Sequence, residues 1–386
     1  MIPRVLCIID TLALGGGAEQ LLATLVPHFR NLGLDVEIAT LLKYAPNHTA
    51  ALRAQGVVVH EFDLPRGRYI ASLHRRLRAL CRERKPDLVW GHMFSGTLQA
   101  VLLSRTFAAG PSIVTLHSES DRKDAPKRWR DRLFRTIEHR AVGWSHRKVA
   151  VSLAVADDYA AFFGWRDISV IHNGVDLAEM PDAPSPEARL TLRASLGAGE
   201  EAVLVVVPSR FVARKGHASL IEALALLKSD AGPGLRVLAC NYATPLLEAL
   251  QALARQRGVA DNIVFGGAMP HEQLFPQMQA ADMVIIPSLR EPFGIAAAEA
   301  MALGVPTILT SIDGFLELVG DSDGAFMVPP NDPPALAAAI RRLRDDKAFG
   351  AALAARGKAR AEANFSIATC AQNWAELFKS MLAERP

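Results

Sequence analysis

Cysteine is scarce in this sequence of 386 residues, and its scarcity excludes several kinds of site. The four cysteines lie far apart in the chain, at Cys7, Cys81, Cys240 and Cys370. Their positions give no metal-ligand spacing, and a reduced cytoplasmic compartment is the simplest interpretation. We therefore expect no cysteine-based metal site.

Long apolar runs, sequence repeats and low-complexity segments are also missing. No stretch of about 18 or more apolar residues is free of charge, so we expect no membrane-spanning helix. The short apolar run at the N-terminus is followed by Asp10, which favours a strand over a signal peptide. Any membrane association would therefore be peripheral, at the inner face of the cell membrane.

The composition is that of a globular chain, with 50% hydrophobic and 22% charged residues. Its length suits two domains, and a proline-rich polar stretch at residues 180–187 has the composition of a linker. Strand and helix patterns alternate on both sides of this stretch, which predicts two α/β domains with parallel sheets. We expect domains at residues 1–180 and 201–365, a linker at 181–200, and a C-terminal helical segment at 366–386.

The most informative segment lies between two predicted buried strands, at residues 281–288 and 305–310. Glu291 falls in the loop after the first strand, and Glu299 falls on the helix that follows. Carboxylates accept hydrogen bonds from sugar hydroxyls. The same spacing could arise by chance in any strand-loop-helix unit.

The start of that helix adds an anion-binding feature. Backbone N–H groups in the first turn of a helix have no partner within the helix, and the helix dipole favours negative charge there. These donors belong to Phe293, Gly294 and Ile295. A phosphate cradle flanked by two carboxylates predicts a site for a sugar diphosphate.

A second segment carries matching cations. The apolar run at residues 202–208 predicts a strand, and an amphipathic helix is expected at 217–228. The loop between them contains Arg210 and Lys215, which could hold a diphosphate without a metal ion. Loop cations are usually only solvated, so each one taken alone also fits that simpler interpretation.

Positive charge is concentrated in the first half of the chain. Residues 1–180 contain 24 Lys and Arg against 18 Asp and Glu, a net charge of +6, whereas the remainder carries −3. Most of the excess falls at residues 72–85 and 122–148, where the candidate contact residues are Arg75, Arg78, Arg82, Arg128 and Arg132. These segments suit an anionic membrane surface or a phosphate-bearing acceptor, or are simply solvated helix faces. We expect no nucleic-acid partner, because no known nucleic-acid module is visible.

Together these motifs resemble the retaining nucleotide-sugar glycosyltransferases of the GT-B fold, specifically glycosyltransferase family 4. The family's Arg-Lys-Gly loop and E-x7-E motif correspond to the two segments above. Gly16 and Gly17 resemble its Gly-rich first loop, residues 112–117 its strand ending in an active-site histidine, and 171–176 its N-G-V-D segment. Two features depart from the pattern. Ser209 replaces a glycine, and residues 240–245 replace the usual Gly-rich turn near the nucleotide.

The resemblance implies two Rossmann-like domains facing a central cleft and assigns roles to individual residues. Glu299 would bind the ribose, Glu291 and His117 would hold the sugar, and Gly16 and Gly17 would help to bind the diphosphate. His92, at the end of the strand before that of His117, is a candidate for the acceptor side, although a structural role fits it equally well. The C-terminal helix would cross back to the first domain.

We therefore predict a retaining, metal-independent transferase that moves a sugar from a nucleotide-diphosphate sugar to a lipid-linked or cell-surface polysaccharide acceptor. The alternatives are a transferase with a soluble acceptor and another GT-B enzyme such as a nucleotide-sugar epimerase. No cofactor is expected beyond the donor, which could carry UDP, GDP or ADP. The one D-x-D sequence, at Asp321 and Asp323, lies in a late turn and predicts no metal site.

Overall fold

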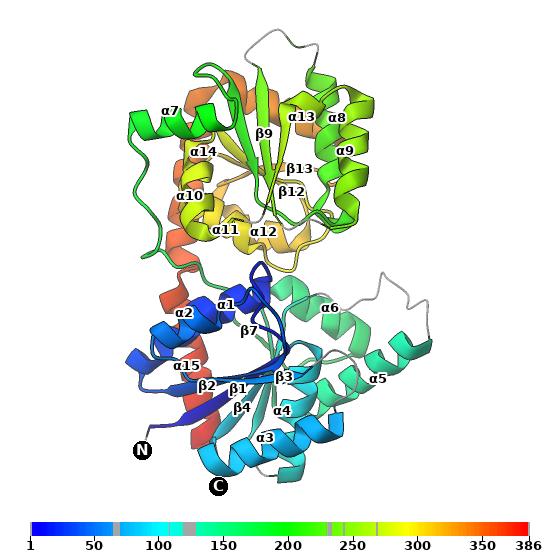
Figure 1. Ribbon diagram of the computed structural model, residues 1–386, viewed down its shortest axis with the longest axis vertical. Helices are drawn as coiled ribbons and strands as arrows, with labels where there is room; N and C mark the ends of the chain where they lie inside the picture. The colour runs from blue at the N-terminus through cyan, green and yellow to red at the C-terminus, as the bar shows by residue number, and fades with distance from the viewer. Residues whose placement is uncertain are drawn as a thin grey trace. The chain divides into compact units, whose positions relative to one another are not determined.

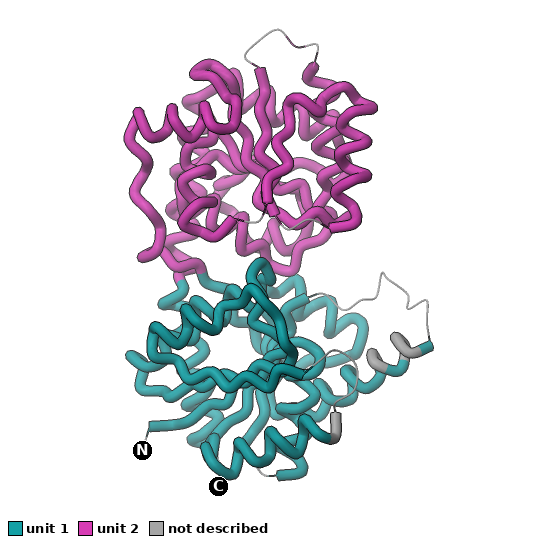
Figure 2. The backbone as a smooth tube through the Cα atoms, viewed as in Figure 1, with its two compact units in different colours: residues 1–174, 367–386 teal, residues 175–366 magenta. Residues whose placement is uncertain are grey.

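The computed structural model describes residues 2–64, 70–107, 109–118, 129–228, 230, 234–241, 244–267 and 269–384. The chain forms two compact units, which differ in colour in Figure 2. Unit 1 comprises Met1–Gly174 and Ile367–Pro386, and unit 2 comprises Val175–Ser366. Each unit is a parallel sheet covered by helices (Figure 1).

Strands and helices alternate along unit 1. Its strands are β1 (Arg4–Ile9), β2 (Asp35–Leu42), β3 (Val59–Leu64), β4 (Leu88–His92), β5 (Ser112–Leu116), β6 (Arg147–Ala150) and β7 (Ile168–Val170). Its helices are α1 (Gly17–Leu25), the 3-10 helix η1 (Val26–Leu32), α2 (Thr49–Ala54), α3 (Ile70–Arg84), α4 (Met93–Phe107), α5 (Trp129–Trp144), α6 (Leu153–Phe163) and α15 (Ile367–Ala383).

Within the described residues, the sheet of unit 1 has the order β3-β2-β1-β4-β5-β6-β7, with all neighbours parallel. The chain builds outward from β1 in one direction and then returns to start the other half at β4. In such sheets, ligands bind where the order reverses, beyond the carboxyl ends of the strands. The reversal point of unit 1 lies between β1 and β4.

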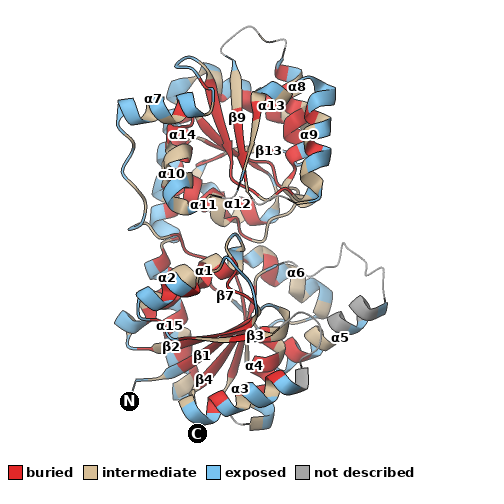
Figure 3. Cartoon of the chain, viewed as in Figure 1, coloured by how far each residue is buried: buried red, intermediate tan, exposed pale blue. Residues whose placement is uncertain are grey.

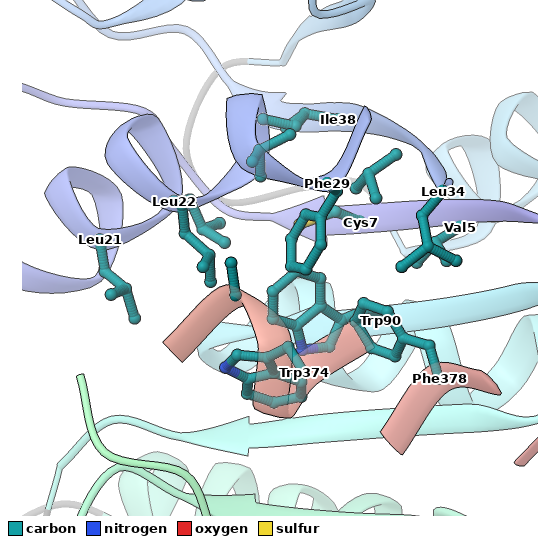
Figure 4. Close-up of a cluster of buried hydrophobic side chains, with 14 of the residues drawn as sticks. Val5, Cys7, Leu21, Leu22, Phe29, Leu34, Ile38, Trp90, Trp374 and Phe378 are labelled. Carbon is teal, nitrogen blue, oxygen red and sulfur yellow. The ribbon is translucent and has the colours of Figure 1, made fainter. Parts of the chain in front are cut away.

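The core of unit 1 contains a cluster of aromatic side chains that joins the two ends of the chain (Figure 4). Trp90 of β4 packs against Trp374 of α15, with ring centroids 4.6 Å apart, and against Phe378, at 5.2 Å. Phe29 of η1 closes the cluster. All four rings are buried, so α15 is part of the hydrophobic core of unit 1.

Unit 2 repeats the alternation. Its strands are β8 (Val203–Val207), β9 (Leu235–Cys240), β10 (Ile263–Gly266), β11 (Met283–Ile286), β12 (Thr307–Thr310) and β13 (Phe326–Val328). Its α-helices are α7 (Pro186–Ser195), α8 (His217–Leu227), α9 (Leu246–Arg257), α10 (His271–Ala280), α11 (Ile295–Ala302), α12 (Asp313–Val319), α13 (Pro333–Asp345) and α14 (Lys347–Asn364). Short 3-10 helices are η3 (Ala213–Lys215), η4 (Ala260–Asn262) and η5 (Gly320–Ser322).

In the described part of unit 2, the parallel sheet has the order β10-β9-β8-β11-β12-β13. Its central strands are buried along their whole length (Figure 3), as expected for a sheet that helices cover on both faces. The reversal point lies between β8 and β11, which pair directly, with Val206 opposite Val284. The loops after these two strands therefore emerge side by side.

The expected linker at residues 181–200 is wrong for its central part, which forms α7 in unit 2. Ser185 caps this helix by accepting a hydrogen bond from the N–H of Ala188 at 3.2 Å, and Pro186 occupies the first turn. Arg193 is buried, and its guanidinium donates to the Ala280 carbonyl at 3.1 Å. The helix is thus anchored to the end of α10 rather than left as a connecting segment.

None of the helices in the described residues is both long and apolar enough to cross a membrane.

Candidate active site

The reversal point of unit 2 brings together the cation and the carboxylate that the sequence placed in separate motifs. Lys215 ends the loop after β8, and Glu291 lies in the loop after β11. The Lys215 Nζ forms an ion pair with the Glu291 Oε2, and the two side chains are only 13% and 11% exposed. Ser288 adds a hydroxyl that donates to the same carboxylate oxygen at 3.4 Å. Arg210 lies earlier in the β8 loop and is partly exposed.

The β8 loop keeps its shape through a glycine and a histidine. Gly216 has φ of 69°, and a Cβ there would lie 1.8 Å from the Pro287 carbonyl oxygen, so only glycine fits. His217 lies within hydrogen-bonding distance of the Arg210 carbonyl oxygen, at 3.1 Å, and of the Ser209 hydroxyl, at 3.2 Å. Because a carbonyl can only accept, the Nε2 of His217 carries the proton.

Burial lowers the pKa of His217, which keeps its ring neutral near pH 7. The sequence did not single out this histidine. Its position at the first residue of the helix after the cationic loop was the available signal.

The second predicted element is the start of α11. Gly294 precedes the helix with φ of 99°, and a Cβ there would lie 2.5 Å from the Phe315 ring. Phe293 is buried and packs edge-on against Phe365, with centroids 5.4 Å apart. The side chain of Phe293 is therefore an anchor in the core of unit 2. Gly294 and Ile295 contribute the backbone at the helix start.

Glu299 lies one turn further along α11 and is buried, with 6% of its surface exposed. Burial raises the pKa of its carboxyl group to about 8. The Nε2 of His271, the first residue of α10, lies 3.3 Å from the Glu299 Oε1. Burial also lowers the pKa of His271, so both groups are mainly uncharged at neutral pH. The sequence gave no signal for this pairing, because it depends on how α10 packs.

In unit 1, His92 ends β4, His117 follows the neighbouring strand β5, and the two rings contact each other. The His92 Nδ1 and the His117 Nε2 are 2.7 Å apart, so one ring donates to the other. Burial lowers the pKa of His117 to about 4, and burial followed by the interaction with His117 lowers the pKa of His92 well below its ordinary value. His92 is fully buried and packs against Trp90 at 4.3 Å. It therefore supports His117 from within the core.

The Gly-rich loop of unit 1 holds a carboxylate of its own. A Cβ on Gly16 would lie 2.0 Å from the Glu19 Oε2, so the Glu19 carboxylate fills the space beside Gly16. The Thr11 hydroxyl donates to the other carboxylate oxygen at 3.0 Å. Gly17 begins α1, and an acidic side chain in a first turn offsets the positive end of the helix dipole. An incoming phosphate would meet this negative charge at the predicted cradle.

The predicted basic residues have different surroundings. Arg75 is exposed on α3, whereas the guanidinium groups of Arg78 and Arg82 lie over the Phe107 ring, at 5.0 and 5.3 Å. Arg128 lies outside the described residues, and so does the side chain of Arg132 within α5. Across the described part of the chain, no group of three or more His, Cys, Asp or Glu residues is placed to hold a metal ion.

Comparison with known proteins places these observations in a family. The family model described as "Glycosyl transferases group 1" matches residues 188–360, and that described as "Glycosyltransferase Family 4" matches residues 15–179. The two matches together cover well over half of the chain and fall on different halves of it.

Individual relatives agree with the family models. A D-inositol 3-phosphate glycosyltransferase of Streptomyces avermitilis is 28% identical over 95% of this chain and 83% of its own length. A glycogen synthase of Mycobacterium tuberculosis is 28% identical over 78% of this chain and 71% of its own length. The crystal structure of Anabaena HepE in complex with UDP-glucose has a TM-score of 0.83 at 24% identity, covering 98% of this chain and 99% of that one. The chain belongs to glycosyltransferase family 4, the group 1 glycosyl transferases, and is a glycosyltransferase with the two parallel-sheet domains of the GT-B fold.

Proposed function

We propose that this glycosyltransferase moves a sugar from a nucleotide-diphosphate sugar to an acceptor hydroxyl, with retention of the anomeric configuration and without a divalent metal ion. The observation that carries the proposal is the pairing of Lys215 with Glu291 at the reversal point of the unit 2 sheet. It sets a cation for phosphate beside a carboxylate for sugar hydroxyls.

The donor diphosphate would be held by unit 2. Lys215 and Arg210 supply positive charge, and the start of α11 supplies backbone donors. Negative charge grows on the diphosphate as the bond to the sugar breaks, and preorganised donors stabilise that charge. These groups would do the work that a divalent ion does in metal-dependent transferases.

The remaining roles follow the family pattern. Glu299 would accept hydrogen bonds from the ribose, and Glu291 and His117 would hold the transferred sugar. Retention requires the acceptor hydroxyl to attack on the face that the diphosphate leaves. HepE was solved with UDP-glucose.

For the acceptor we propose a lipid-linked or cell-surface polysaccharide substrate at an anionic membrane. The supporting observation is the outer face of α5, where Trp129, Leu133 and Trp144 are 70%, 50% and 58% exposed. Their spacing places them on one face of the helix, and Arg140 is exposed on the same face. Tryptophan and arginine together suit the boundary between lipid headgroups and acyl chains.

A soluble acceptor is the second candidate, and two observations favour it. The names of the two relatives above refer to inositol 3-phosphate and to glycogen, neither of which is a lipid. In addition, Arg78 and Arg82 stack on Phe107, so α3 offers fewer free cations than its sequence suggests.

A transfer assay tests the proposal. The protein is supplied with UDP-, GDP-, ADP- and dTDP-sugars and candidate acceptors in the presence of EDTA, and the product anomer is assigned by NMR. We expect one donor to give a product with the donor's anomeric configuration. Inversion, or activity that EDTA abolishes and Mn²⁺ or Mg²⁺ restores, would contradict it.

A further inference from the structure

In the proposed donor site, Lys215 and Glu291 form an ion pair with each other. Both side chains are largely buried, so each charge depends on the other for compensation. The backbone of Glu291 packs closely against Gly314, where a Cβ would lie 2.2 Å from the Glu291 carbonyl oxygen. The pair therefore gives each of these buried charges a partner at the proposed donor site.

We propose that Glu291 makes this site discriminate between a diphosphate that carries a sugar and one that does not. The inference rests on the proposed function, in which Lys215 binds the diphosphate and Glu291 the sugar. The new element is that Glu291, by neutralising Lys215, makes the site prefer the nucleotide-diphosphate sugar to the nucleotide diphosphate that remains after transfer.

A nucleotide diphosphate without a sugar gains little from Lys215. To contact the diphosphate, Lys215 must share or leave its carboxylate partner. Glu291 is then a buried carboxylate beside phosphate oxygens of the same charge, which is unfavourable. Ser288 supplies only one hydroxyl to it, at 3.4 Å.

A nucleotide-diphosphate sugar removes that penalty. Its diphosphate takes Lys215, and its sugar hydroxyls donate to the carboxylate that Lys215 has left. Every buried charge then has a partner. Glu291 therefore lowers the affinity for the nucleotide diphosphate more than the affinity for the donor.

The same exchange favours product release. Once the sugar has moved to the acceptor, Glu291 loses the hydroxyls that compensated it. Lys215 is the nearest replacement, so the ion pair can re-form as the nucleotide diphosphate leaves. The proposal involves no new covalent step.

Calorimetric titration of Glu291→Gln tests the inference. The probes are inorganic pyrophosphate, the pairs UDP and UDP-glucose, ADP and ADP-glucose, and GDP and GDP-mannose. Gln keeps the shape of the side chain and removes its charge, so Lys215 is no longer neutralised. We expect pyrophosphate and the nucleotide diphosphate to bind on the order of tenfold more tightly, the effect of one charge interaction. The affinity for the corresponding nucleotide-diphosphate sugar should rise by a smaller factor or should fall.

Two controls assign the effect to the pair. Glu222→Gln removes a carboxylate that pairs with Arg257 on the surface of the same unit and should leave every affinity unchanged. The double variant Lys215→Gln with Glu291→Gln should not show the tighter binding of pyrophosphate and nucleotide diphosphate, because it lacks the lysine whose charge the Glu291→Gln change exposes. Glu291→Ala replaces the Gln variant if that protein does not fold.

The outcomes separate the two proposals. If the wild-type protein binds none of the nucleotide-diphosphate sugars, the proposed function fails and the inference falls with it. If the wild type binds a donor but a folded Glu291 variant binds pyrophosphate and the nucleotide diphosphate no more tightly, the inference alone is overturned.

Discussion

Single residues at the proposed site carry charges that depend on burial. Lys215 and Glu291 compensate each other, Glu299 has a raised pKa, and His117 has a lowered one. From the sequence, Lys215 taken alone also fits a loop cation that is only solvated. Its burial against Glu291 changes that expectation, because removing it leaves an uncompensated carboxylate in unit 2.

Glu299 should make both stability and donor binding depend on pH. Its pKa is about 8 in the folded protein, against 4.5 for an ordinary glutamate, so folding favours the protonated form. Stability should therefore fall as the pH rises from about 4.5 to about 8, by up to ~1.4 kcal/mol per unit. Donor affinity should rise over the upper part of this window, because ribose hydroxyls donate best to a carboxylate.

Urea unfolding at several pH values measures the Glu299 effect. Unit 1 contains all five tryptophans, Trp90, Trp129, Trp144, Trp165 and Trp374, so tryptophan fluorescence follows the unfolding of unit 1. Circular dichroism follows both units, so a change in circular dichroism that has no matching change in fluorescence reports the unfolding of unit 2. Glu299→Gln should flatten the pH dependence of unit 2, and the exposed Glu248→Gln should not. Equal slopes in the wild type and Glu299→Gln would show that Glu299 is ionised in the folded state.

The His92–His117 pair should act in the opposite direction on unit 1. Burial lowers the pKa of both histidines below the ordinary 6.5, and that of His117 to about 4. The unfolded chain therefore takes up protons first, and stability should be lost as the pH falls from 6.5 towards 4. Tryptophan fluorescence during unfolding should show a shallower loss for His92→Gln than for the control His28→Gln. An unchanged slope would contradict the buried neutral pair.

At the scale of elements, the loop after β8 and the helix after it form the most constrained part of the site. Gly216 links η3 to α8 with a positive φ and lies against the carbonyl of Pro287. The collision, not the backbone angle alone, should decide the effect of a substitution here.

Gly216→Ala should therefore displace the loop that carries Arg210 and Lys215, destabilise unit 2 and weaken donor binding. The matched control is Gly164→Ala, which has a similar φ of 73° but no atom within 4 Å of an added Cβ. It should cost only the strain of about 1–2 kcal/mol that a left-handed alanine carries. Melting and donor titration distinguish the two. Equal losses in both variants would mean that the contact with Pro287 has no special role.

The elements that the sequence predicted well are those with local signals. Continuous apolar runs marked β8 and β11 because their strands are buried on both faces. For residues 181–200 we predicted a linker from the prolines, but the structure has α7 there. Ser185 followed by Pro186 is also a typical helix start. The pairings His92–His117, His271–Glu299 and Lys215–Glu291 could not be predicted. Each depends on which elements become neighbours, a property of the sheet order and packing.

At the scale of the whole molecule, the ends of the chain meet in unit 1, where α15 completes the core around Trp90. Unit 2 carries the proposed diphosphate and ribose contacts. Unit 1 carries the exposed α5 face and an excess of positive charge in residues 1–180. Unit 1 thus combines the proposed membrane contact with His117, which is proposed to hold the transferred sugar together with Glu291 of unit 2.

If the α5 face docks on a membrane, the protein should co-sediment with anionic vesicles and dissociate as salt is raised. Trp129→Ser with Trp144→Ser should reduce binding by about tenfold or more, because each large apolar side chain contributes roughly 1.5–3 kcal/mol when buried. Leu226→Ser, exposed on α8 of unit 2, is the control. Sedimentation that is equal with neutral and anionic vesicles, or absent with both, would favour the soluble acceptor.

Donor binding with EDTA present is the most direct test of the central claim that unit 2 binds a nucleotide-diphosphate sugar through Lys215. A thermal-shift panel of UDP-, GDP-, ADP- and dTDP-sugars should reveal at least one ligand that stabilises the wild type. At 100 times its dissociation constant, the gain is about 2.7 kcal/mol. We expect Lys215→Gln to lose this shift and Lys228→Gln, a change at an exposed residue at the end of α8, to keep it. No shift with any donor, or an equal shift in folded Lys215→Gln, would contradict the central claim.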